Sequence, residues 1–180
     1  MPQIDISSSD IRNRVARGLT INEFVPDSVS RYISQEHLMK KIKKYLKKHL
    51  TKERYHHTVG VAYTAMSMAM KYNPQPDNNE FMIKAEIAGL LHDCAKCMDN
   101  DKKIRICNKN QISYSKIEAE NPYLLHGKVG AYIARKEFDI LDEDILNAIT
   151  WHTTGRPDMS LLEKIIFVAD YIEPSRRPIR

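Results

Sequence analysis

Apolar residues recur at intervals of three and four along most of this chain, and that spacing is the feature that most limits its fold. The clearest case is the segment 35–50, in which Met39, Ile42 and Leu46 share one face of a helix. No run of strand length alternates β-branched with polar residues. We therefore predict an all-α fold, an orthogonally packed helical bundle.

Helix-stop signals divide this pattern into consecutive segments. Asparagines and prolines mark breaks at 73–77 and 121–122, and Glu173-Pro174 ends the last helix. The first 35 residues are polar and Ser-rich and lack a strong apolar stripe, so we divide the chain into a short segment, 1–35, and a domain, 36–180. The predicted helices cover 35–50, 55–72, 79–91, 99–109, 113–119, 126–138, 142–151 and 160–172.

Composition excludes several classes of protein. A chain of 180 residues with 42% hydrophobic and 28% charged residues is long and apolar enough to build a core without disulfides. No apolar stretch approaches the roughly 18 residues of a membrane span, and the first residues lack the pattern of a signal peptide. Three cysteines are too few for a disulfide scaffold and indicate a reducing compartment. We predict a cytoplasmic protein that does not bind membranes.

The net charge of +5 is concentrated in one segment. Residues 40–54 contain eight Lys or Arg and one Glu, a local charge of +7, which leaves −2 for the rest of the chain. A solvated helix face explains these residues, and contact with nucleic acid or phosphate is the alternative. Because no recognition motif accompanies the charge, we predict no specific nucleic-acid partner.

Several residues have side chains suited to metal binding. Asp93 directly follows His92 at the end of an apolar run, and Asp170 lies inside the apolar run 165–172. A carboxylate in such a run costs several kcal/mol unless it is paired with a cation or binds a metal, so a salt bridge is the alternative for Asp170. One buried histidine is usually a satisfied core residue, but four beside apolar sequence indicate a metal site. These histidines, each at or near the end of a predicted helix, are His57, His92, His126 and His152.

In this order, the residues resemble the HD superfamily of metal-dependent phosphohydrolases, in its binuclear form H…HD…H…H…D. Their flanks resemble more closely the bacterial HD-type symmetrical bis(5′-nucleosyl)-tetraphosphatases, which cleave diadenosine tetraphosphate to two ADP. The resemblance covers residues 38–180. Its motifs are RYHHT at 54–58, GLLHDCAK at 89–96, LLHG at 124–127, WHTTGR at 151–156 and ADYIEP at 169–174.

The resemblance implies two transition-metal ions. Imidazole and carboxylate ligands favour Fe, Mn, Co, Ni or Zn over Mg or Ca, and the family points to iron. Asp93 would bridge both ions, and a hydroxide between them would attack a phosphorus. The ligands would be His57, His92 and Asp170 for one ion, and His126 and His152 for the other.

Positive charge should surround the polyphosphate. With Asp93, we predict Lys96 and Arg156 as catalytic residues, because both follow metal-binding motifs and suit phosphate. A surface Lys or Arg without a ligand is the alternative for either residue. Arg54 would bind phosphate or pair with an acid such as Glu173. The predicted substrate-binding residues are Arg54, Lys96, Thr153, Thr154, Gly155 and Arg156.

The two ends of the chain carry separate expectations. ISSSDIR at 6–12 resembles the late ISST-x-x-R motif of nicotinate-nucleotide adenylyltransferases, with Ser9 in place of Thr, and 19–33 fits the helical tail of that family. We therefore expect a fusion with such an enzyme, and a Ser-rich helix cap is the alternative. The chain stops ten residues after Asp170, where the tetraphosphatases continue with a further helix. One wall of the pocket is therefore expected to be incomplete.

The function predicted from sequence is symmetrical hydrolysis of a dinucleoside polyphosphate by a monomer or homodimer. Two alternatives remain open. One is an HD hydrolase acting on a guanosine alarmone or a nucleoside triphosphate. The other is a metal- and nucleotide-binding sensor without turnover. Cys94 and Cys97 form a C-x-x-C, but no second pair accompanies them, so we expect ordinary reduced thiols.

Overall fold

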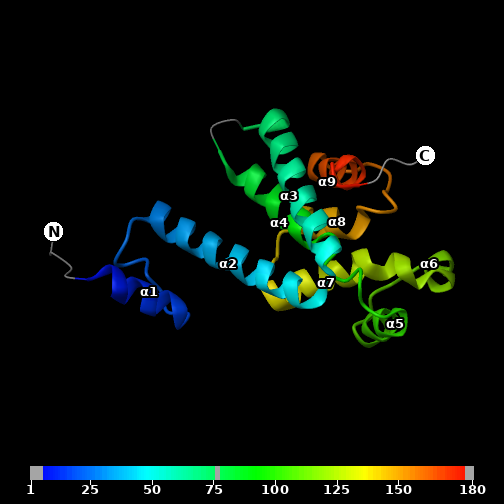
Figure 1. The fold of residues 1–180 in the computed structure, drawn as a ribbon, viewed down its shortest axis with the longest axis horizontal. Helices are drawn as coiled ribbons and strands as arrows, with labels where there is room; N and C mark the ends of the chain where they lie inside the picture. Colours follow the sequence, from blue (N-terminus) through cyan, green and yellow to red (C-terminus); the bar gives the residue numbers. More distant parts are fainter. Residues whose placement is uncertain (1–5, 76–77, 177–180) are drawn as a thin grey trace. The chain divides into compact units, whose positions relative to one another are not determined.

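The computed structural model describes residues 6–75 and 78–176, and all regular elements in these ranges are helical (Figure 1). The prediction of an all-α fold is confirmed for this part of the chain. The elements are α1 (Ser8–Ala16), α2 (Asp27–His49), α3 (Lys52–Tyr72), α4 (Glu80–Leu91), α5 (Asn100–Lys109), α6 (Lys116–Glu120), η1 (Pro122–Leu125), α7 (His126–Phe138), α8 (Glu143–Trp151) and α9 (Leu161–Ile172).

The chain divides into two compact units, Met1–Lys41 and Ile42–Arg180. Helix α2 runs through the boundary, and its predicted start at residue 35 was wrong because it begins at Asp27, directly after a proline. Its first turns were missed since Val29 and Tyr32 are 41% and 63% exposed and form no buried stripe. The predicted start of the short helix at residue 113 was also early, because Ser115 is the N-cap of α6.

The N-terminal unit, Met1–Lys41, is held largely by local interactions. Ser7 and Asp10 form a capping box at the start of α1, and α1 contains no buried residue. The guanidinium of Arg14 lies 4.5 Å from the ring centre of Phe24. An open groove of about 440 Å³ lies between α1 and α2, with Val15 and Ile33 among its lining residues.

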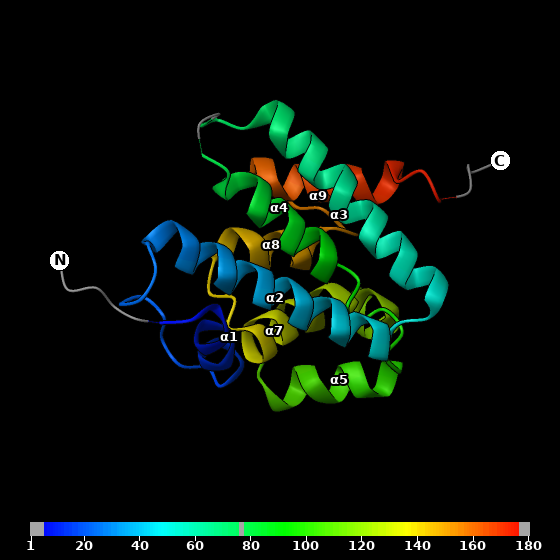
Figure 2. The ribbon, with the colours of Figure 1, turned by 60° about the vertical axis from the view of Figure 1, so that its left-hand side comes forward.

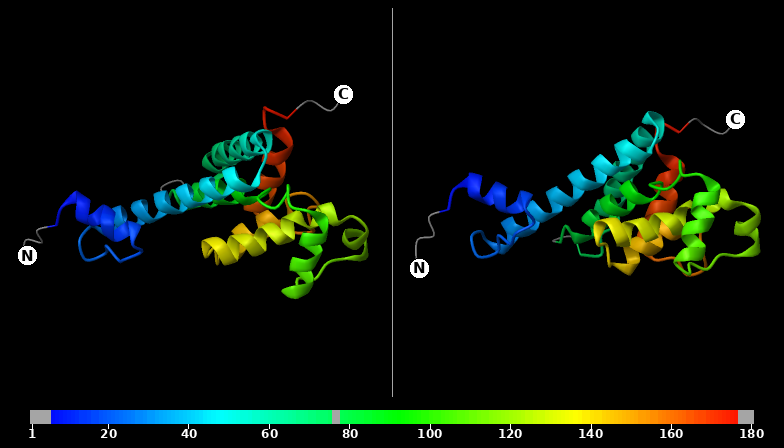
Figure 3. Two further views of the ribbon diagram at one scale, coloured as in Figure 1. Left: turned by 60° about the horizontal axis from the view of Figure 1, so that its bottom comes forward. Right: turned by 90° about the horizontal axis from the view of Figure 1, so that it is seen from below.

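The second unit, Ile42–Arg180, contains most of the buried apolar residues, and Figure 2 shows the arrangement of its helices. Helix α3 packs most extensively against α4, α7 against α8, and α8 against α9, which returns to α3. Helices α5 and α7 lie on the opposite side of this unit from α3 (Figure 3). Helix α4 contacts α3, α7, α8 and α9, and the residues of its last two turns are almost all buried. The residues that directly follow α4 therefore lie at the centre of the unit.

No helix among the described residues is both long and apolar enough to cross a membrane.

Candidate metal centre

The six predicted metal ligands all lie in the second unit and come from five different helices or helix ends. They are His57 in α3, His92 and Asp93 after α4, His126 at the start of α7, His152 after α8, and Asp170 in the last turn of α9. His57 was expected near a helix end. It lies instead in the second turn of α3, because the helix begins at Lys52, three residues before the predicted start, with the Thr51 side chain as its cap.

The helices bring these six side chains into one cluster. His126 Nε2 lies 3.2 Å from Asp93 Oδ1, and His152 Nε2 lies 3.5 Å from the same oxygen. On the other side, the Nε2 atoms of His57 and His92 lie 3.0 and 3.8 Å from Asp170 Oδ1. Two groups of three have ligand atoms close enough to share an ion. They are His57, His92 and Asp170, and His92, Asp93 and His152.

Most of the cluster is sealed from solvent. His92 and His126 are fully buried, and Asp93 and His152 are each 2% exposed. An ionised carboxylate at this depth requires a cation or several hydrogen-bond donors. The cluster therefore lies in a protected interior, where its electrostatic interactions are strong.

Main-chain carbonyls fix the tautomers of three histidines. Nδ1 of His92 lies 2.6 Å from the Gly89 oxygen, and the Nδ1 atoms of His126 and His152 each lie 2.7 Å from the carbonyl three residues earlier. A carbonyl only accepts hydrogen bonds, so each Nδ1 carries the proton and donates. Each Nε2 keeps a lone pair directed at the cluster, as a metal ligand requires.

The cluster contains closely spaced polar atoms that a cation between them would satisfy. Among the described residues, His92 Nε2 and Asp93 Oδ1 are buried without a hydrogen-bond partner. The Nε2 atoms of His126 and His152 lie 3.0 Å apart, although both are hydrogen-bond acceptors in the neutral tautomer. Each buried unsatisfied polar group costs about 1–3 kcal/mol. The residues therefore fit a metal, and their nitrogen and carboxylate donors suit a transition metal.

The pKa values of four of the ligands also favour metal binding. Burial lowers the pKa of His92 to about 4 and lowers that of His126 below its ordinary value, so both imidazoles are neutral near pH 7. Burial alone would raise the pKa of Asp93, but His92, His126 and His152 hold it well below the usual range. Burial would also raise the pKa of Asp170, yet its hydrogen bond with His57 and the nearby His92 bring it to about 2. Neutral imidazoles and ionised carboxylates are the forms that bind metal.

Three of the predicted substrate-binding residues contact the cluster. Arg54 Nη1 lies 2.9 Å from Asp93 Oδ2, so the acid that pairs with Arg54 is Asp93 and the suggestion of Glu173 was wrong. Lys96 Nζ lies 3.2 Å from His126 Nε2 and 3.7 Å from Asp93 Oδ1. The Thr153 hydroxyl lies 3.1 Å from His126 Nε2. These groups place donors and positive charge at the edge of the buried cluster.

The other three make different contacts. Arg156 forms a two-pronged ion pair with Glu163, at 2.7 and 3.0 Å, and Glu163 is fully buried. Gly155 has a φ of +63°, which favours glycine in this turn, and Thr154 is exposed beside it. The partnership of Arg156 with Glu163 was not predicted, because seven residues of turn and helix start separate the pair.

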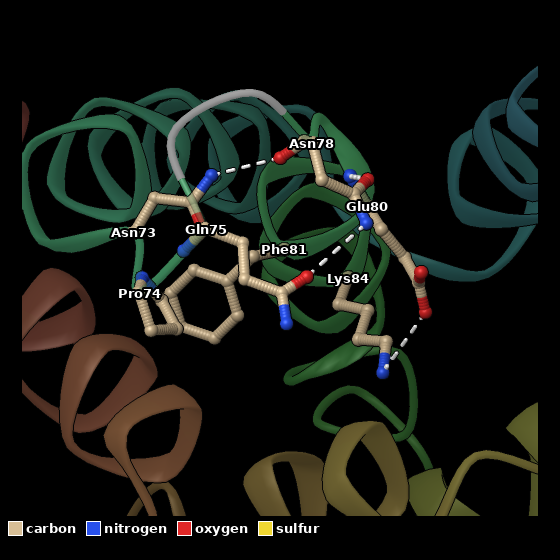
Figure 4. Close-up of a pocket in the computed structure, with 7 residues that line it drawn as sticks. All are labelled: Asn73, Pro74, Gln75, Asn78, Glu80, Phe81 and Lys84. Carbon is tan, nitrogen blue, oxygen red and sulfur yellow. Dashed lines mark hydrogen bonds and ion pairs between the residues drawn. The ribbon is translucent and has the colours of Figure 1, made fainter.

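A cleft of about 440 Å³ opens beside His57. Arg54 and Arg176 are among its lining residues, and Arg176 Nη2 lies 3.5 Å from Asp170 Oδ1. Sequence analysis missed Arg176, although its position six residues after Asp170 could have indicated it. A separate hollow of about 270 Å³ between α3 and α4 is formed by residues of the 73–84 region and contains none of the predicted site residues (Figure 4). The cleft beside His57 is therefore the better route to the cluster.

Comparisons with known proteins point to the same family as the sequence motifs. The HD domain family matches residues 54–175. The protein named symmetrical bis(5′-nucleosyl)-tetraphosphatase from Halalkalibacterium halodurans is 48% identical over 132 residues, which are 73% of this chain and 67% of that protein. The crystal structure of a predicted HD superfamily hydrolase involved in NAD metabolism, from Clostridium acetobutylicum, matches with a TM-score of 0.70 and 49% identity, over 77% of this chain and 70% of that one.

One relative extends the match toward the N-terminus. It is named probable nicotinate-nucleotide adenylyltransferase/Ap4A hydrolase and comes from Mycoplasma genitalium. It is 29% identical over 174 residues, which are 97% of this chain but 45% of that protein. Because 174 of 180 residues are aligned, the match includes most of Met1–Lys41.

Proposed function

The chain belongs to the HD domain family, and on that basis we propose that it hydrolyses diadenosine tetraphosphate symmetrically, releasing two molecules of ADP. The observation that carries the proposal is a largely buried cluster of four His and two Asp in a chain 48% identical to a symmetrical bis(5′-nucleosyl)-tetraphosphatase. A sensor without turnover would be expected to lack part of such a set. The cluster is therefore better explained by catalysis than by binding alone.

We propose that the cluster holds two transition-metal ions, iron in the first instance, with Mn, Co, Ni or Zn able to take its place. Asp93 is the proposed bridge, with His57, His92 and Asp170 on one side and His126 and His152 on the other. The two groups of ligand atoms that lie close together share His92, so this histidine is near both positions. Such metals supply activation of water and polarisation of a phosphoryl oxygen.

The chain's own residues would bind and orient the polyphosphate. Lys96 and Thr153 lie against His126 and can donate to phosphate oxygens at the edge of the cluster. Arg54 already holds Asp93 and faces the cleft beside His57, where it can contact a second phosphate. Arg156 is proposed as a further contact, and reaching a phosphate would require it to exchange its ion pair with Glu163. No side-chain nucleophile is needed in this arrangement.

The test combines metal analysis with product analysis. Freshly purified protein should contain about two transition-metal ions per chain and should convert diadenosine tetraphosphate to ADP as the only nucleotide product. Formation of AMP and ATP in equal amounts would contradict symmetrical cleavage. Bound metal with no turnover of this substrate, but hydrolysis of a guanosine alarmone or a nucleoside triphosphate, would favour the alternative substrates.

We also propose that residues 1–35 are the tail of a nicotinate-nucleotide adenylyltransferase and that 36–180 form the hydrolase domain. The support is the alignment of most of Met1–Lys41 with the Mycoplasma genitalium protein, whose name combines both activities. An N-terminal unit stabilised by local caps, with an apolar groove left open, is consistent with a piece of a larger fold. This proposal predicts that the hydrolase does not depend on the N-terminal unit.

We further propose a cytoplasmic protein that acts as a monomer or homodimer and binds neither membranes nor specific nucleic acid. All three cysteines are free thiols, with Cys94 and Cys107 buried and Cys97 exposed, which supports a reducing compartment. Size-exclusion chromatography with light scattering distinguishes the two oligomeric states.

A further inference from the structure

Glu173 makes an unexpected contact with the metal cluster from outside it. It follows α9 directly, and its Oε2 accepts a hydrogen bond from His57 Nδ1 at 2.9 Å. Glu173 is only 5% exposed, and a glutamate is rarely buried to this degree unless it is paired. The end of α9 thus supplies Asp170 to one ring nitrogen of His57 and Glu173 to the other.

The carboxylate of Glu173 is itself fixed in place. Its Oε1 accepts from the backbone N–H of Ser175 at 2.9 Å, and its Oε2 accepts from the Ser175 hydroxyl at 2.6 Å. Together with His57, these donors hold both oxygens in one orientation. A carboxylate held by several hydrogen bonds is a preorganised acceptor, because those bonds restrict the rotation of its side chain.

Gly60 provides the space for this approach. It lies one helical turn after His57 in α3, and a Cβ built on it would lie 2.8 Å from Glu173 Cδ and 2.9 Å from Cγ. Real Cβ atoms essentially never come that close to another carbon, so any larger residue would displace the carboxylate. Glycine inside a helix lowers stability by about 0.5–1 kcal/mol relative to alanine. The close approach of Glu173 explains why a glycine is present at this position.

The position of His57 in its helix explains why it needs such a partner. His92, His126 and His152 lie at helix ends, where the carbonyl three residues earlier is free to accept from Nδ1. His57 lies within α3, where the carbonyls of the preceding turn accept the helix's own hydrogen bonds. Its Nδ1 proton is donated instead to an acceptor from another element, Glu173.

We infer that Glu173 is a positioning residue for the metal centre, and that Gly60 is the residue that admits it. By accepting from Nδ1, Glu173 keeps a proton on that nitrogen, so that Nε2, which lies 3.0 Å from Asp170 Oδ1, is the nitrogen that would give up its proton and bind a metal. A carboxylate acceptor also makes the imidazole a stronger ligand than a carbonyl does. This inference rests on the proposed metal centre but not on the identity of the substrate.

The test measures Co²⁺ binding to the metal-free full-length chain by its visible absorption, so that it needs no substrate. Glu173→Ala should weaken Co²⁺ binding about 10- to 100-fold, the usual effect of losing such a partner. Glu173→Gln retains an oxygen that can accept from Nδ1 and should stay within about threefold of the unmodified chain. Gly60→Ala should weaken binding as Glu173→Ala does, although alanine favours the helix.

Glu118→Ala is the matched control. Glu118 is also a buried carboxylate, and it accepts from Lys128 and from the backbone of Ser115, away from the six ligands. Its removal should lower the melting temperature without changing Co²⁺ affinity. Unchanged affinity in Glu173→Ala, or equal losses in Glu173→Ala, Glu173→Gln and Glu118→Ala, would overturn the inference, because Glu173 would then be structural only.

The same measurement separates this inference from the proposed function. If the unmodified chain binds Co²⁺ tightly but does not cleave diadenosine tetraphosphate, the proposed substrate is wrong, and the pattern among the variants still decides the role of Glu173. If the unmodified chain binds no Co²⁺, the metal centre and the role of Glu173 fail together.

Discussion

Helices α1 and α4 show how differently the two units are stabilised. Helix α1, in Met1–Lys41, buries none of its residues, and Ser7 and Asp10 satisfy its first N–H groups through a capping box. Helix α4, in Ile42–Arg180, has no side-chain cap, yet half of its twelve residues are buried. Local hydrogen bonds define the first helix, and packing against four neighbours defines the second.

The two units also differ in how their polar groups are satisfied. The polar groups at the start of α1 satisfy each other, whereas two polar atoms in the residues that follow α4 lack a hydrogen-bond partner among the described residues. His92 Nε2 and Asp93 Oδ1 are buried with no hydrogen-bond partner among the described residues. A well-packed helix that ends in unsatisfied polar atoms marks the place where we expect a metal ion to bind. Each of the following predictions tests this difference.

The largest expected effect is that of Asp93→Ala. This variant should lose bound metal and should lower kcat by at least about a thousandfold, because the metals provide several kcal/mol of transition-state stabilisation. Far-UV circular dichroism should show that the helices remain, since the change removes a buried charge without opening a large cavity. Elemental analysis and steady-state kinetics provide the measurements. Turnover near that of the unmodified chain would exclude Asp93 from the centre.

Removing the metal should destabilise only the second unit. A ligand that binds only the folded state at a hundred times its Kd adds about 2.7 kcal/mol to the free energy of unfolding. For a unit of this size, chelation should lower the melting temperature by roughly 5–10 °C. Differential scanning calorimetry with and without chelator, followed by return of the metal, tests this expectation. An unchanged melting temperature would mean that the cluster is stable without an ion.

Gly89→Ala should weaken the contact between α3 and α4. A Cβ at Gly89 would lie 2.7 Å from Ala62 Cα and 3.1 Å from Ala62 N, so helix backbone and not a mobile side chain would have to move. We expect a loss of about 1–3 kcal/mol in the free energy of unfolding, measured by urea titration. Met70→Ala is the control on α3, because Met70 is 66% exposed. Equal effects of the two changes would show that the close packing of α4 is not essential.

Two similar capping boxes allow a direct comparison between the units. Ser7 and Asp10 form an exposed one in α1, and Ser115 and Glu118 form a buried one in α6. Burial would raise the pKa of Glu118, but hydrogen bonds from Ser115 and Lys128 hold it below its ordinary value. The ionised carboxylate therefore contributes stability above its unfolded pKa, and this contribution is lost as the pH falls through the folded pKa.

Glu118→Gln should accordingly cost about 1 kcal/mol at pH 7 and much less near pH 3. Asp10→Asn should have a smaller effect at pH 7, because Asp10 is exposed to solvent. Urea titrations of both variants at the two pH values provide the comparison. A cost for Glu118→Gln that does not change with pH would show that the charge of Glu118 is unimportant.

Sequence was a good guide where local patterns determine structure. The all-α fold and the order of its helices from residue 52 onward are confirmed, because apolar spacing and proline breaks are local signals. The family is confirmed as well, since five ordered motifs carry it. The start of α2 was missed because its first turns bury no apolar stripe, and the early start of α3 was missed because a single threonine provides its cap.

Contacts between distant residues were harder to predict. The bond between His57 and Glu173 joins residues 116 positions apart, and no local pattern indicates that the second turn of α3 will meet the end of α9. Glu173 was named as one acid with which Arg54 could pair, as the alternative to binding phosphate, whereas Arg54 pairs with Asp93, because the chain that follows α4 turns into the cluster. The roles of the six ligands and of the substrate-binding residues stay predictions, since motif and geometry place them together without showing what they bind.

The smallest expected effect comes from removing residues 1–26. All six proposed ligands and the residues of the cleft lie beyond Lys41, so hydrolysis should change by no more than about twofold. Helix α2 is kept because its later residues Ile42 and Leu46 are fully buried. Steady-state kinetics and Co²⁺ binding measure the effect, and the same truncation carrying Asp93→Ala provides the inactive reference. A tenfold loss of kcat/KM would contradict the independence of the two units, and with it the proposal that the N-terminal unit belongs to a different enzyme.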